Sequence, residues 1–477
     1  VQASSATRSY GYGLWLRPAS DGRFTPYFQG SDPGVSFLSS HDPSTGRTIT
    51  LVSNLGDDVW GLEAEIGRVL DAGPAAYSGP RAARSEAGGS GRPGFRAPRP
   101  FTIHLEDEVL ADLRARIRST RWPEPSPGPA WAQGTDLDYL KAILAYWAEG
   151  YDWRAREREL NAFSHFRAEV DGTAVHFVHE RAKGGGGIPL ILGHGWPSSF
   201  VELLPLVPLL TDPAAHGIEG PSFDLVIPSL PGYGFSPRPR RAGLDYRQVA
   251  GIWASLMRGL GYERYGAGGG DFGAGVASHL AMKEPGSVIG LHLSNLEIPP
   301  YCGAGSRPLS TAEAAYLARN LEWRREEGGY REIQGTKPQT LAYALNDSPA
   351  GLASWILEKW RSWTDSGGDL DARFGRDFLL TTLTLYWATG TIGSSIRDYY
   401  DNRHFGGATG PRDFVGVPTG IALFSRSFVD EGTPPREWAE RLYDIRRWTP
   451  MPRGGHFAPI EEPELLARDI AAFFGAL

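Results

Sequence analysis

The chain has 477 residues, of which 41% are hydrophobic and 22% charged, enough to bury a sizeable core in about two or three globular domains. Acidic residues outnumber basic ones by 55 to 48, and the net charge of −7 gives no support for a nucleic-acid partner or an anionic membrane surface. No run of about 18 apolar residues occurs, so no membrane anchor is expected. The single cysteine, Cys302, excludes an intramolecular disulfide. Without a signal-peptide pattern, the expected compartment is the cytoplasm.

The first part of the chain divides into a small unit and a linker. Strand patterns at 13–16 and 48–52 and helical spacing at 59–70 predict a small α+β unit over residues 1–72. Residues 73–97 are rich in Gly, Pro, Ala, Ser and Arg and hold almost no large aliphatic side chains. They are therefore expected to form a flexible linker.

Two amphipathic helices are expected next, over 105–121 and after Asp136. From residue 174, short apolar runs alternate with helical stretches, which predicts a mainly parallel sheet with helices on both faces. The runs lie at 174–179, 189–192, 223–227, 287–293 and 420–424. A helical stretch dense in Trp and Tyr interrupts this alternation. The resulting domain predictions are 98–173, 174–300, 301–404 and 405–477.

The most informative stretch is Gly266-Ala-Gly-Gly-Gly-Asp-Phe-Gly-Ala-Gly275. Within it, Gly269-x-Asp271-x-Gly273 matches the nucleophile elbow of hydrolases, with aspartate where serine usually stands. Its glycines permit a sharp strand-to-helix turn that lifts the central side chain out of the sheet. A carboxylate placed there can attack a tetrahedral carbon and form an alkyl ester, which water then cleaves.

The same glycines leave another class of protein open. Gly268-x-Gly270-x-x-Gly273, with Glu297 downstream, fits the dinucleotide fingerprint of a nucleotide-binding oxidoreductase. A glycine-rich turn that merely carries a surface aspartate would give the same pattern.

Two histidine motifs favour the hydrolase interpretation. His194-Gly-Trp-Pro197 follows an apolar strand, where the backbone amides of Trp196 and Phe272 would form an oxyanion hole. We expect His194 to be held in its turn and, with Pro197, to border the substrate pocket. His456 follows the last strand-like run, which gives the chain order nucleophile, acid, histidine.

No metal or cofactor is expected. His176 and His179 are three residues apart on a predicted strand and therefore point to opposite faces, and no His-Glu-x-x-His motif occurs.

From Pro98 to Leu477, roughly four fifths of the chain, the sequence resembles epoxide hydrolases of the microsomal and juvenile-hormone type. The matching segments are Arg99-Pro-Phe101, His194-Gly-Trp-Pro197, Leu230-Pro-Gly-Tyr-Gly-Phe-Ser236, Gly269-Gly-Asp-Phe-Gly273, Ala344-Leu-Asn-Asp-Ser-Pro-Ala-Gly-Leu352, Tyr386-Trp-Ala-Thr-Gly-Thr-Ile392 and Arg453-Gly-Gly-His-Phe-Ala458.

This resemblance implies an α/β-hydrolase core, an N-terminal helical segment that wraps it, and a helical lid at 301–404. It implies hydrolysis of a hydrophobic epoxide to a vicinal diol by way of an aspartyl ester, with Asp271 as nucleophile and His456 as base. Tyr330 and Tyr399 are implied as hydrogen-bond donors to the epoxide oxygen, with Tyr400 as the neighbouring choice for the second. A phenol with a pKa near 10 can protonate an alkoxide while it stays protonated at neutral pH.

Several alternatives stay open. A haloalkane or haloacid dehalogenase of the same fold would also use an aspartate nucleophile, and a catalytically inactive hydrolase fold used for binding is a further class. The sequence does not decide between a monomer and a homodimer. Residues 10–70 resemble the C-terminal end of β-lactamase-like serine hydrolases. Because no Ser-x-x-Lys occurs in the chain, we expect no such activity.

The third member of the triad departs from the family pattern. The position at which the family carries its acid is Ser427, and a serine cannot hold an imidazolium electrostatically as a carboxylate does. Asp430 and Glu431 follow in the same loop. We assign Asp430, because a short slip of the loop brings it into register. The other interpretation of Asp430 is a solvated loop acid.

We predict that Asp430→Asn slows hydrolysis of the ester intermediate far more than its formation, because only hydrolysis needs a charge partner for His456. Single-turnover kinetics separate the two steps. An unchanged rate of ester hydrolysis would remove Asp430 from the triad.

Overall fold

The structure is a computed structural model that describes residues 94–238, 242–424, 426 and 432–477, together with the backbone of six strands within residues 1–53. The chain forms two units, Val1–Gly89 and Ser90–Leu477. In the described part of the chain, no helix is long and apolar enough to span a membrane.

The first unit contains a six-stranded antiparallel sheet in which strands that follow each other in sequence pair with each other. Its strands are β1 (Gln2–Ser5), β2 (Arg8–Gly11), β3 (Leu14–Pro18), β4 (Phe24–Asp32), β5 (Val35–Asp42) and β6 (Arg47–Ser53). The strands predicted at 13–16 and 48–52 correspond to β3 and β6. The helix predicted at 59–70 lies outside the described residues.

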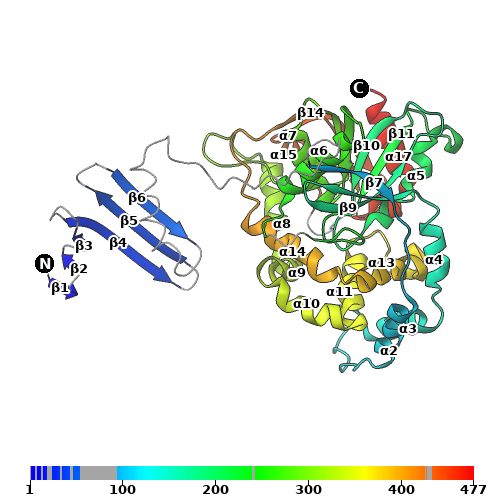
Figure 1. Ribbon diagram of the computed structural model, residues 1–477, viewed down its shortest axis with the longest axis horizontal. Coiled ribbons are helices and arrows are strands. Elements are labelled where there is room, and N and C mark those ends of the chain that lie inside the picture. The colour runs from blue at the N-terminus through cyan, green and yellow to red at the C-terminus, as the bar shows by residue number, and fades with distance from the viewer. Residues whose placement is uncertain are drawn as a thin grey trace. The chain divides into compact units, whose positions relative to one another are not determined.

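The second unit is built on a nine-stranded mixed sheet (Figure 1). In spatial order its strands are β15 (Tyr443–Met451), β14 (Val415–Phe424), β13 (Val288–Leu293), β12 (Tyr265–Gly269), β10 (Ile188–Gly193), β11 (Phe223–Pro228), β9 (Thr173–Glu180), β8 (His165–Val170) and β7 (Phe95–Pro100). The strands from β15 to β11 are parallel to one another. The pairings of β11 with β9, β9 with β8 and β8 with β7 are antiparallel. Each predicted apolar run falls on one of these strands, so the mainly parallel sheet is confirmed.

The linker ends earlier in the chain than predicted. Phe95 pairs with Val170, so residues 95–97, predicted as linker, belong to the edge strand β7. Composition alone missed this strand because Arg and Pro dominate it, and edge strands tolerate both.

Helices cover the sheet and form a layer beside it. They are α2 (Asp107–Arg118), α3 (Leu137–Glu149), α4 (Trp153–Leu160), α5 (Leu206–Thr211), α6 (Tyr246–Gly259), α7 (Phe272–Lys283), α8 (Thr311–Glu327), α9 (Gly329–Thr336), α10 (Pro338–Asp347), α11 (Pro349–Ser362), α12 (Leu370–Phe374), α13 (Arg376–Thr389), α14 (Ile392–His404), α15 (Arg436–Ala439), α16 (Ala458–Glu461) and α17 (Pro463–Phe474), with 3-10 turns η1 (Phe200–Leu203) and η2 (Pro213–His216). Helices α8 to α14 form the insertion predicted at 301–404. The helices predicted at 105–121 and after Asp136 are α2 and α3, and both pack against α11 of the insertion (Figure 1).

Local chemistry explains where these helices begin. The side chain of Asp136 accepts a hydrogen bond from the amide of Tyr139 at 2.9 Å and caps α3. At the start of α8, Ser310 and Glu313 form a reciprocal capping box.

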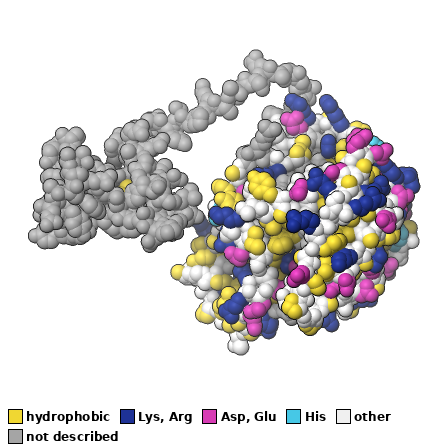
Figure 2. All heavy atoms as spheres, turned by 90° about the horizontal axis from the view of Figure 1, so that it is seen from below, with side chains coloured by type: hydrophobic (Ala, Val, Ile, Leu, Met, Phe, Trp, Pro, Cys, Tyr) yellow, Lys and Arg dark blue, Asp and Glu magenta, His cyan; other side chains and the backbone are white. Residues whose placement is uncertain are grey.

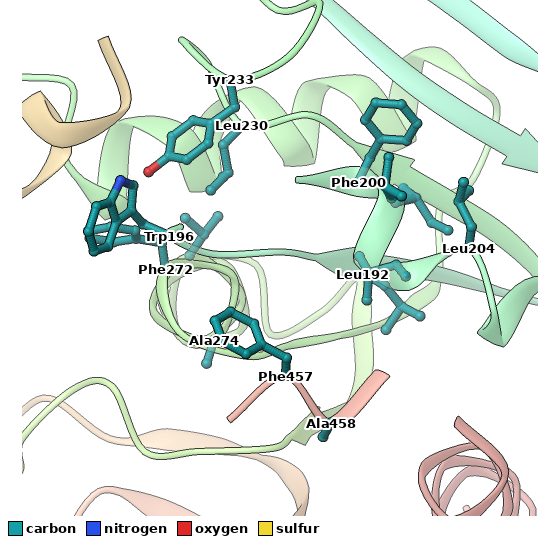
Figure 3. Close-up of a cluster of buried hydrophobic side chains, with 14 of the residues drawn as sticks. Leu192, Trp196, Phe200, Leu204, Leu230, Tyr233, Phe272, Ala274, Phe457 and Ala458 are labelled. Atoms are coloured by element: carbon teal, nitrogen blue, oxygen red, sulfur yellow. The ribbon is translucent and has the colours of Figure 1, made fainter. Parts of the chain in front are cut away.

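The core of the second unit is dense in aromatic side chains. Trp360 of α11 stacks on Phe457 with ring centroids 3.8 Å apart, which joins the insertion to the sheet domain. Figure 3 shows Phe457 next to Ala274 of α7, within the same buried cluster as Leu192 and Phe200. On the face shown in Figure 2, positive and negative side chains are interspersed with apolar ones.

A buried ion cluster also ties the insertion to the sheet domain. Arg238 follows the loop after β11, and its side chain is 3% exposed. Its guanidinium pairs with Asp398 and with Asp401 of α14, the latter at 2.5 Å. Breaking such a pair leaves a charge buried without compensation, which costs more than an exposed pair contributes.

We predict that Arg238→Met lowers the free energy of unfolding by about 3–5 kcal/mol, because two carboxylates lose their buried partner. Chemical denaturation followed by tryptophan fluorescence measures this change. The control is Arg446→Met, which removes an exposed pair with Asp444 and should cost no more than about 1 kcal/mol. Equal losses for the two variants would contradict the prediction.

Candidate active site

Asp271 stands at a sharp turn between β12 and α7, as the nucleophile-elbow pattern predicts. Its backbone has φ 49° and ψ −129°, a conformation that a non-glycine residue rarely adopts. The turn is possible only because its neighbours lack side chains. A Cβ atom on Gly273 would lie 2.2 Å from the carbonyl oxygen of Gly193, and one on Gly269 would lie 2.5 Å from the same atom.

The two amides predicted for an oxyanion hole both donate to the carboxylate of Asp271. Oδ1 accepts from the amide of Trp196 at 2.9 Å and from the amide of Phe272 at 2.8 Å. The amide of Asp271 itself donates to Oδ1 of Asn295 at 2.7 Å, and this hydrogen bond stabilises the conformation of the turn. One carboxylate oxygen is therefore held by amides, and the other, Oδ2, is turned toward His456.

His456 lies in a loop whose backbone is fixed by buried groups. Its amide donates to the carbonyl oxygen of Trp363 at 2.8 Å. The carboxylate of Glu461 accepts from the amides of Gly455 at 3.0 Å and Phe457 at 3.1 Å, on either side of the histidine. Nε2 of the buried imidazole then lies 3.4 Å from Oδ2 of Asp271.

The electrostatic environment favours the charged form of this imidazole. Burial alone would lower the pKa of His456. The hydrogen bond and the charge of Asp271, together with the charges of Glu202 and Glu297, outweigh that effect, so the pKa lies above its ordinary value of 6.5. Loss of the charge on Asp271 would therefore favour the neutral imidazole, the form that acts as a base.

His194 and Pro197 support the oxyanion loop. Nε2 of His194 accepts a hydrogen bond from the amide of Leu230 at 3.1 Å, and burial lowers the pKa of His194 to about 4. The carbonyl oxygen of Pro197 accepts from the indole of Trp360 at 3.2 Å. His194 is held in a turn, as expected. Neither residue is among the described residues that line the cavity at Asp271, and their place at the substrate pocket stays a prediction.

Tyr330 of α9 and Tyr399 of α14 meet in a cluster of aromatic rings and line the same cavity as Asp271. Their ring centroids are 5.8 Å apart, and Trp196 stacks on Tyr330 at 5.7 Å. Tyr399 packs edge-on against Phe272 at 4.9 Å, and Trp363 contacts Tyr330 at 5.2 Å. The structure thus brings both predicted tyrosines, the nucleophile and the oxyanion loop to one place.

Between the two neighbouring tyrosines, the structure favours Tyr399. Tyr399 lines the cavity at Asp271, whereas the ring of Tyr400 packs on His404 with centroids 4.2 Å apart. Burial is the largest cause that raises the pKa of Tyr399 well above 10, so its hydroxyl stays protonated.

These groups border a cavity of about 90 Å³. The described residues that line it are Asp271, Phe272, Ser294, Asn295, Leu296, Glu297, Tyr316, Trp323, Tyr330, Arg331, Tyr399, Leu423, Phe424, Gly432, Thr433 and Pro434. A second cavity of about 570 Å³ shares Phe272, Glu297, Arg331 and Tyr399 with it. Glu297 was considered in the sequence only as part of a dinucleotide fingerprint, and Arg331 was not singled out.

Asn295 and Glu461 are supporting residues that the sequence analysis missed. Asn295 lies two residues beyond the end of strand β13, at the carboxyl edge of the sheet where Asp271 also lies, and that position was a usable signal. No such signal marks Glu461, at the end of α16. Its role is to accept hydrogen bonds from the backbone amides of Gly455 and Phe457, which no sequence pattern indicates. Ser427 and Asp430 lie outside the described residues, so the triad acid stays a prediction. In the described part of the chain, no cluster of residues fits a metal site.

A parallel sheet with the nucleophile on a strand-to-helix elbow and the histidine on a late loop defines the α/β-hydrolase class. Residues 188–367 accordingly match the family model for the alpha/beta hydrolase fold. Residues 98–203 match the model of the epoxide hydrolase N terminus.

The chain belongs to the epoxide hydrolase family. It is 40% identical to a putative epoxide hydrolase of Stigmatella aurantiaca, with 79% of this chain and 85% of that protein covered. It is 38% identical to epoxide hydrolase 1 of Oryctolagus cuniculus, with 79% and 88% covered. The crystal structure of juvenile hormone epoxide hydrolase from Bombyx mori superimposes with a TM-score of 0.72 at 32% identity, over 80% of this chain and 94% of that one.

These relatives do not favour the dehalogenase or the oxidoreductase alternative. The resemblance of residues 10–70 to β-lactamase-like hydrolases receives no support from them, because the matched regions cover the part of the chain after the linker.

We predict that Asp271→Asn lowers the pKa of His456 below its wild-type value, because it removes the carboxylate that stabilises the imidazolium. An NMR titration of the histidine ring, assigned with His456→Gln, measures the change. Asp444→Asn, at a surface strand, is the matched control. An equal or higher pKa in Asp271→Asn would contradict the electrostatic account.

Proposed function

We propose that this protein hydrolyses hydrophobic epoxides to vicinal diols through a covalent ester on Asp271. The observation that carries the proposal is that the two oxygens of the Asp271 carboxylate face different groups. Oδ1 is held by the amides of Trp196 and Phe272, and Oδ2 is directed toward His456 at the cavity lined by Tyr330 and Tyr399. This arrangement provides a nucleophile, an oxyanion hole, a base and two proton donors at one place.

In the first half-reaction, Oδ2 of Asp271 attacks one carbon of the epoxide, and the bond between that carbon and the epoxide oxygen breaks. The electron pair of the broken bond moves onto the oxygen. Tyr330 and Tyr399 donate hydrogen bonds to this oxygen, and a phenolic proton neutralises the developing alkoxide. The product is a hydroxyalkyl ester in which Oδ1 is the carbonyl oxygen, still held by the two amides.

In the second half-reaction, water attacks the carbonyl carbon of the ester. Esterification removes the negative charge of Asp271, so the pKa of His456 falls and the neutral imidazole can take a proton from water. The amides of Trp196 and Phe272 stabilise the oxyanion that forms on Oδ1. Collapse of the intermediate releases the diol and leaves one oxygen from water in the side chain of Asp271. Once the ester bond has broken, the imidazolium gives its proton to the leaving alkoxide. The second proton of the water molecule, left on the new carboxyl group of Asp271, returns to the tyrosinate.

We infer that Asp430 is the acid that orients His456. Two contacts of neighbouring residues support this. The amide of Arg426 donates to the carbonyl oxygen of Gly454, which brings the chain after β14 beside the histidine loop. Beyond Asp430, the segment from Gly432 to Pro434 lines the cavity.

The insertion at 301–404 is proposed as the lid, because it supplies both tyrosines and the aromatic wall of Tyr316 and Trp323. Aromatic walls favour apolar substituents on the epoxide. No residue assigned to the reaction requires a cofactor, and water is the second substrate.

The test is a single turnover of excess enzyme with styrene oxide in water enriched in ¹⁸O. We expect the label in the peptide that contains Asp271 and an unlabelled diol, because the diol receives its second oxygen from the carboxylate. Mass spectrometry of the digested protein and of the diol measures both. Label in the diol and none in the peptide would overturn the covalent mechanism.

Parallel assays with a bromoalkane and with Asp271→Asn complete the experiment. The bromoalkane is expected to release no bromide. Asp271→Asn is expected to form no ester. Faster turnover of the bromoalkane than of styrene oxide would favour the dehalogenase instead.

A further inference from the structure

A buried lysine lies behind the proton-donating tyrosines. Lys359 is on α11 and is 6% exposed, although lysine is rarely buried. Its ammonium nitrogen lies over the ring of Tyr330, 4.7 Å from the ring centre, and 5.9 Å from the ring of Trp363. Both rings belong to the aromatic cluster around Tyr330 and Tyr399.

The energetic cost of burying this ammonium is reduced by an adjacent carboxylate. Glu358 accepts from the ammonium at 2.5 Å and is itself 23% exposed. The ion pair compensates the buried charge. It does not explain why the ammonium lies against the face of a ring, since an ion pair alone could form at the surface. A cation against an aromatic face is attracted by the quadrupole of the ring, most strongly where water is excluded.

We propose that Lys359 is a positioning residue that makes Tyr330 a better proton donor in epoxide opening. The inference rests on the proposed role of Tyr330. As the phenol of Tyr330 gives its proton to the epoxide oxygen, negative charge grows on the phenolic oxygen and spreads into the ring. The ammonium of Lys359 attracts that ring more strongly in the transition state than in the ground state, and only such a difference accelerates the step.

The proton balance of the step is unchanged by Lys359. The proton moves from the hydroxyl of Tyr330 to the epoxide oxygen, and Lys359 keeps its own protons. Because ester hydrolysis involves Asp271, His456 and water, the ammonium should affect alkylation and leave hydrolysis of the ester unaltered. A purely structural role for Lys359 would disturb the two steps alike.

The experiment measures the single-turnover rate constants of ester formation and ester hydrolysis. Lys359→Met is expected to slow ester formation about 30-fold, equivalent to about 2 kcal/mol, and to change ester hydrolysis less than about twofold. Lys359→Arg keeps the cation and should retain most of the rate. Lys359→Gln is a second neutral variant, which keeps a hydrogen-bond donor for Glu358 and should behave like Lys359→Met if the latter folds poorly.

The matched control is Lys141→Met. Lys141 lies over the ring of Trp122 at 5.6 Å, so it makes the same kind of contact at a place far from the cavity. We expect both rate constants of this variant to equal those of the wild type. A slow alkylation step in this variant would show that loss of any such contact reduces activity, and would overturn the inference.

Leaving-group chemistry gives a readout that folding defects do not mimic. Trifluoromethyl oxirane opens to a less basic alkoxide than methyl oxirane and needs less proton donation. The loss caused by Lys359→Met should therefore be smaller with trifluoromethyl oxirane. An equal loss with both epoxides would overturn the proposed electrostatic role.

A double-mutant cycle with Tyr330→Phe separates the inference from the proposed function. If Tyr330→Phe leaves ester formation unchanged, the role of Tyr330 as proton donor fails, and this inference fails with it. If Tyr330→Phe slows ester formation, adding Lys359→Met to that variant should slow the step little further. A full additional loss in the double variant would leave the function of Tyr330 intact and refute the role of Lys359.

Discussion

The site depends on the close approach of the backbone at the end of β10 to the backbone of the turn that carries Asp271. The carbonyl oxygen of Gly193, at the end of β10, lies where a side chain on Gly269 or Gly273 would have to be. The approach of β10 to the elbow brings the amide of Trp196, three residues beyond Gly193, onto the same carboxylate oxygen as the amide of Phe272. The strained backbone of Asp271 is stabilised by these contacts, and the oxyanion hole exists before any substrate enters.

Electrostatic differences between the groups around Asp271 assign their tasks. His194 is buried, and the effect of burial outweighs its hydrogen bond with Gly195 and the charge of Asp271, so its pKa falls to about 4 and it serves as a neutral hydrogen-bond acceptor. His456 is equally buried but faces Asp271, so its pKa rises. The same residue type thus acts as a structural support in one loop and as the proposed base in another, and the direct hydrogen bond with Asp271, together with the charges of Glu202 and Glu297, makes the difference.

The insertion does more than cover the cavity at Asp271. It holds Tyr330 and Tyr399 at the cavity, it is joined to the sheet domain by Arg238 and by the stack of Trp360 on Phe457, and it carries the lysine beneath Tyr330. These links make the positions of the two proposed proton donors depend on the whole second unit, so a change far from Asp271 in sequence is expected to alter the first half-reaction.

Local sequence determined several features of this protein without the structure. Apolar runs identified five strands of the large sheet, because buried parallel strands are apolar on both faces. Glycine spacing identified the elbow and Asp271, because a turn with positive φ and close backbone contacts tolerates few other residues. The chain order of the hydrolase triad indicated His456, and the resemblance to a family supplied Tyr330 and Tyr399.

Tertiary structure alone decided the remaining features, because they are contacts between residues far apart in the chain. The choice of Tyr399 over Tyr400 depends on which side of α14 faces the cavity. Arg and Pro concealed β7, which is defined only by its pairing with β8. Asn295 contacts a backbone amide, and Lys359 contacts a ring, that only folding brings to them. A local pattern records which residues a turn or a strand can accept, whereas these partners are specified only by packing.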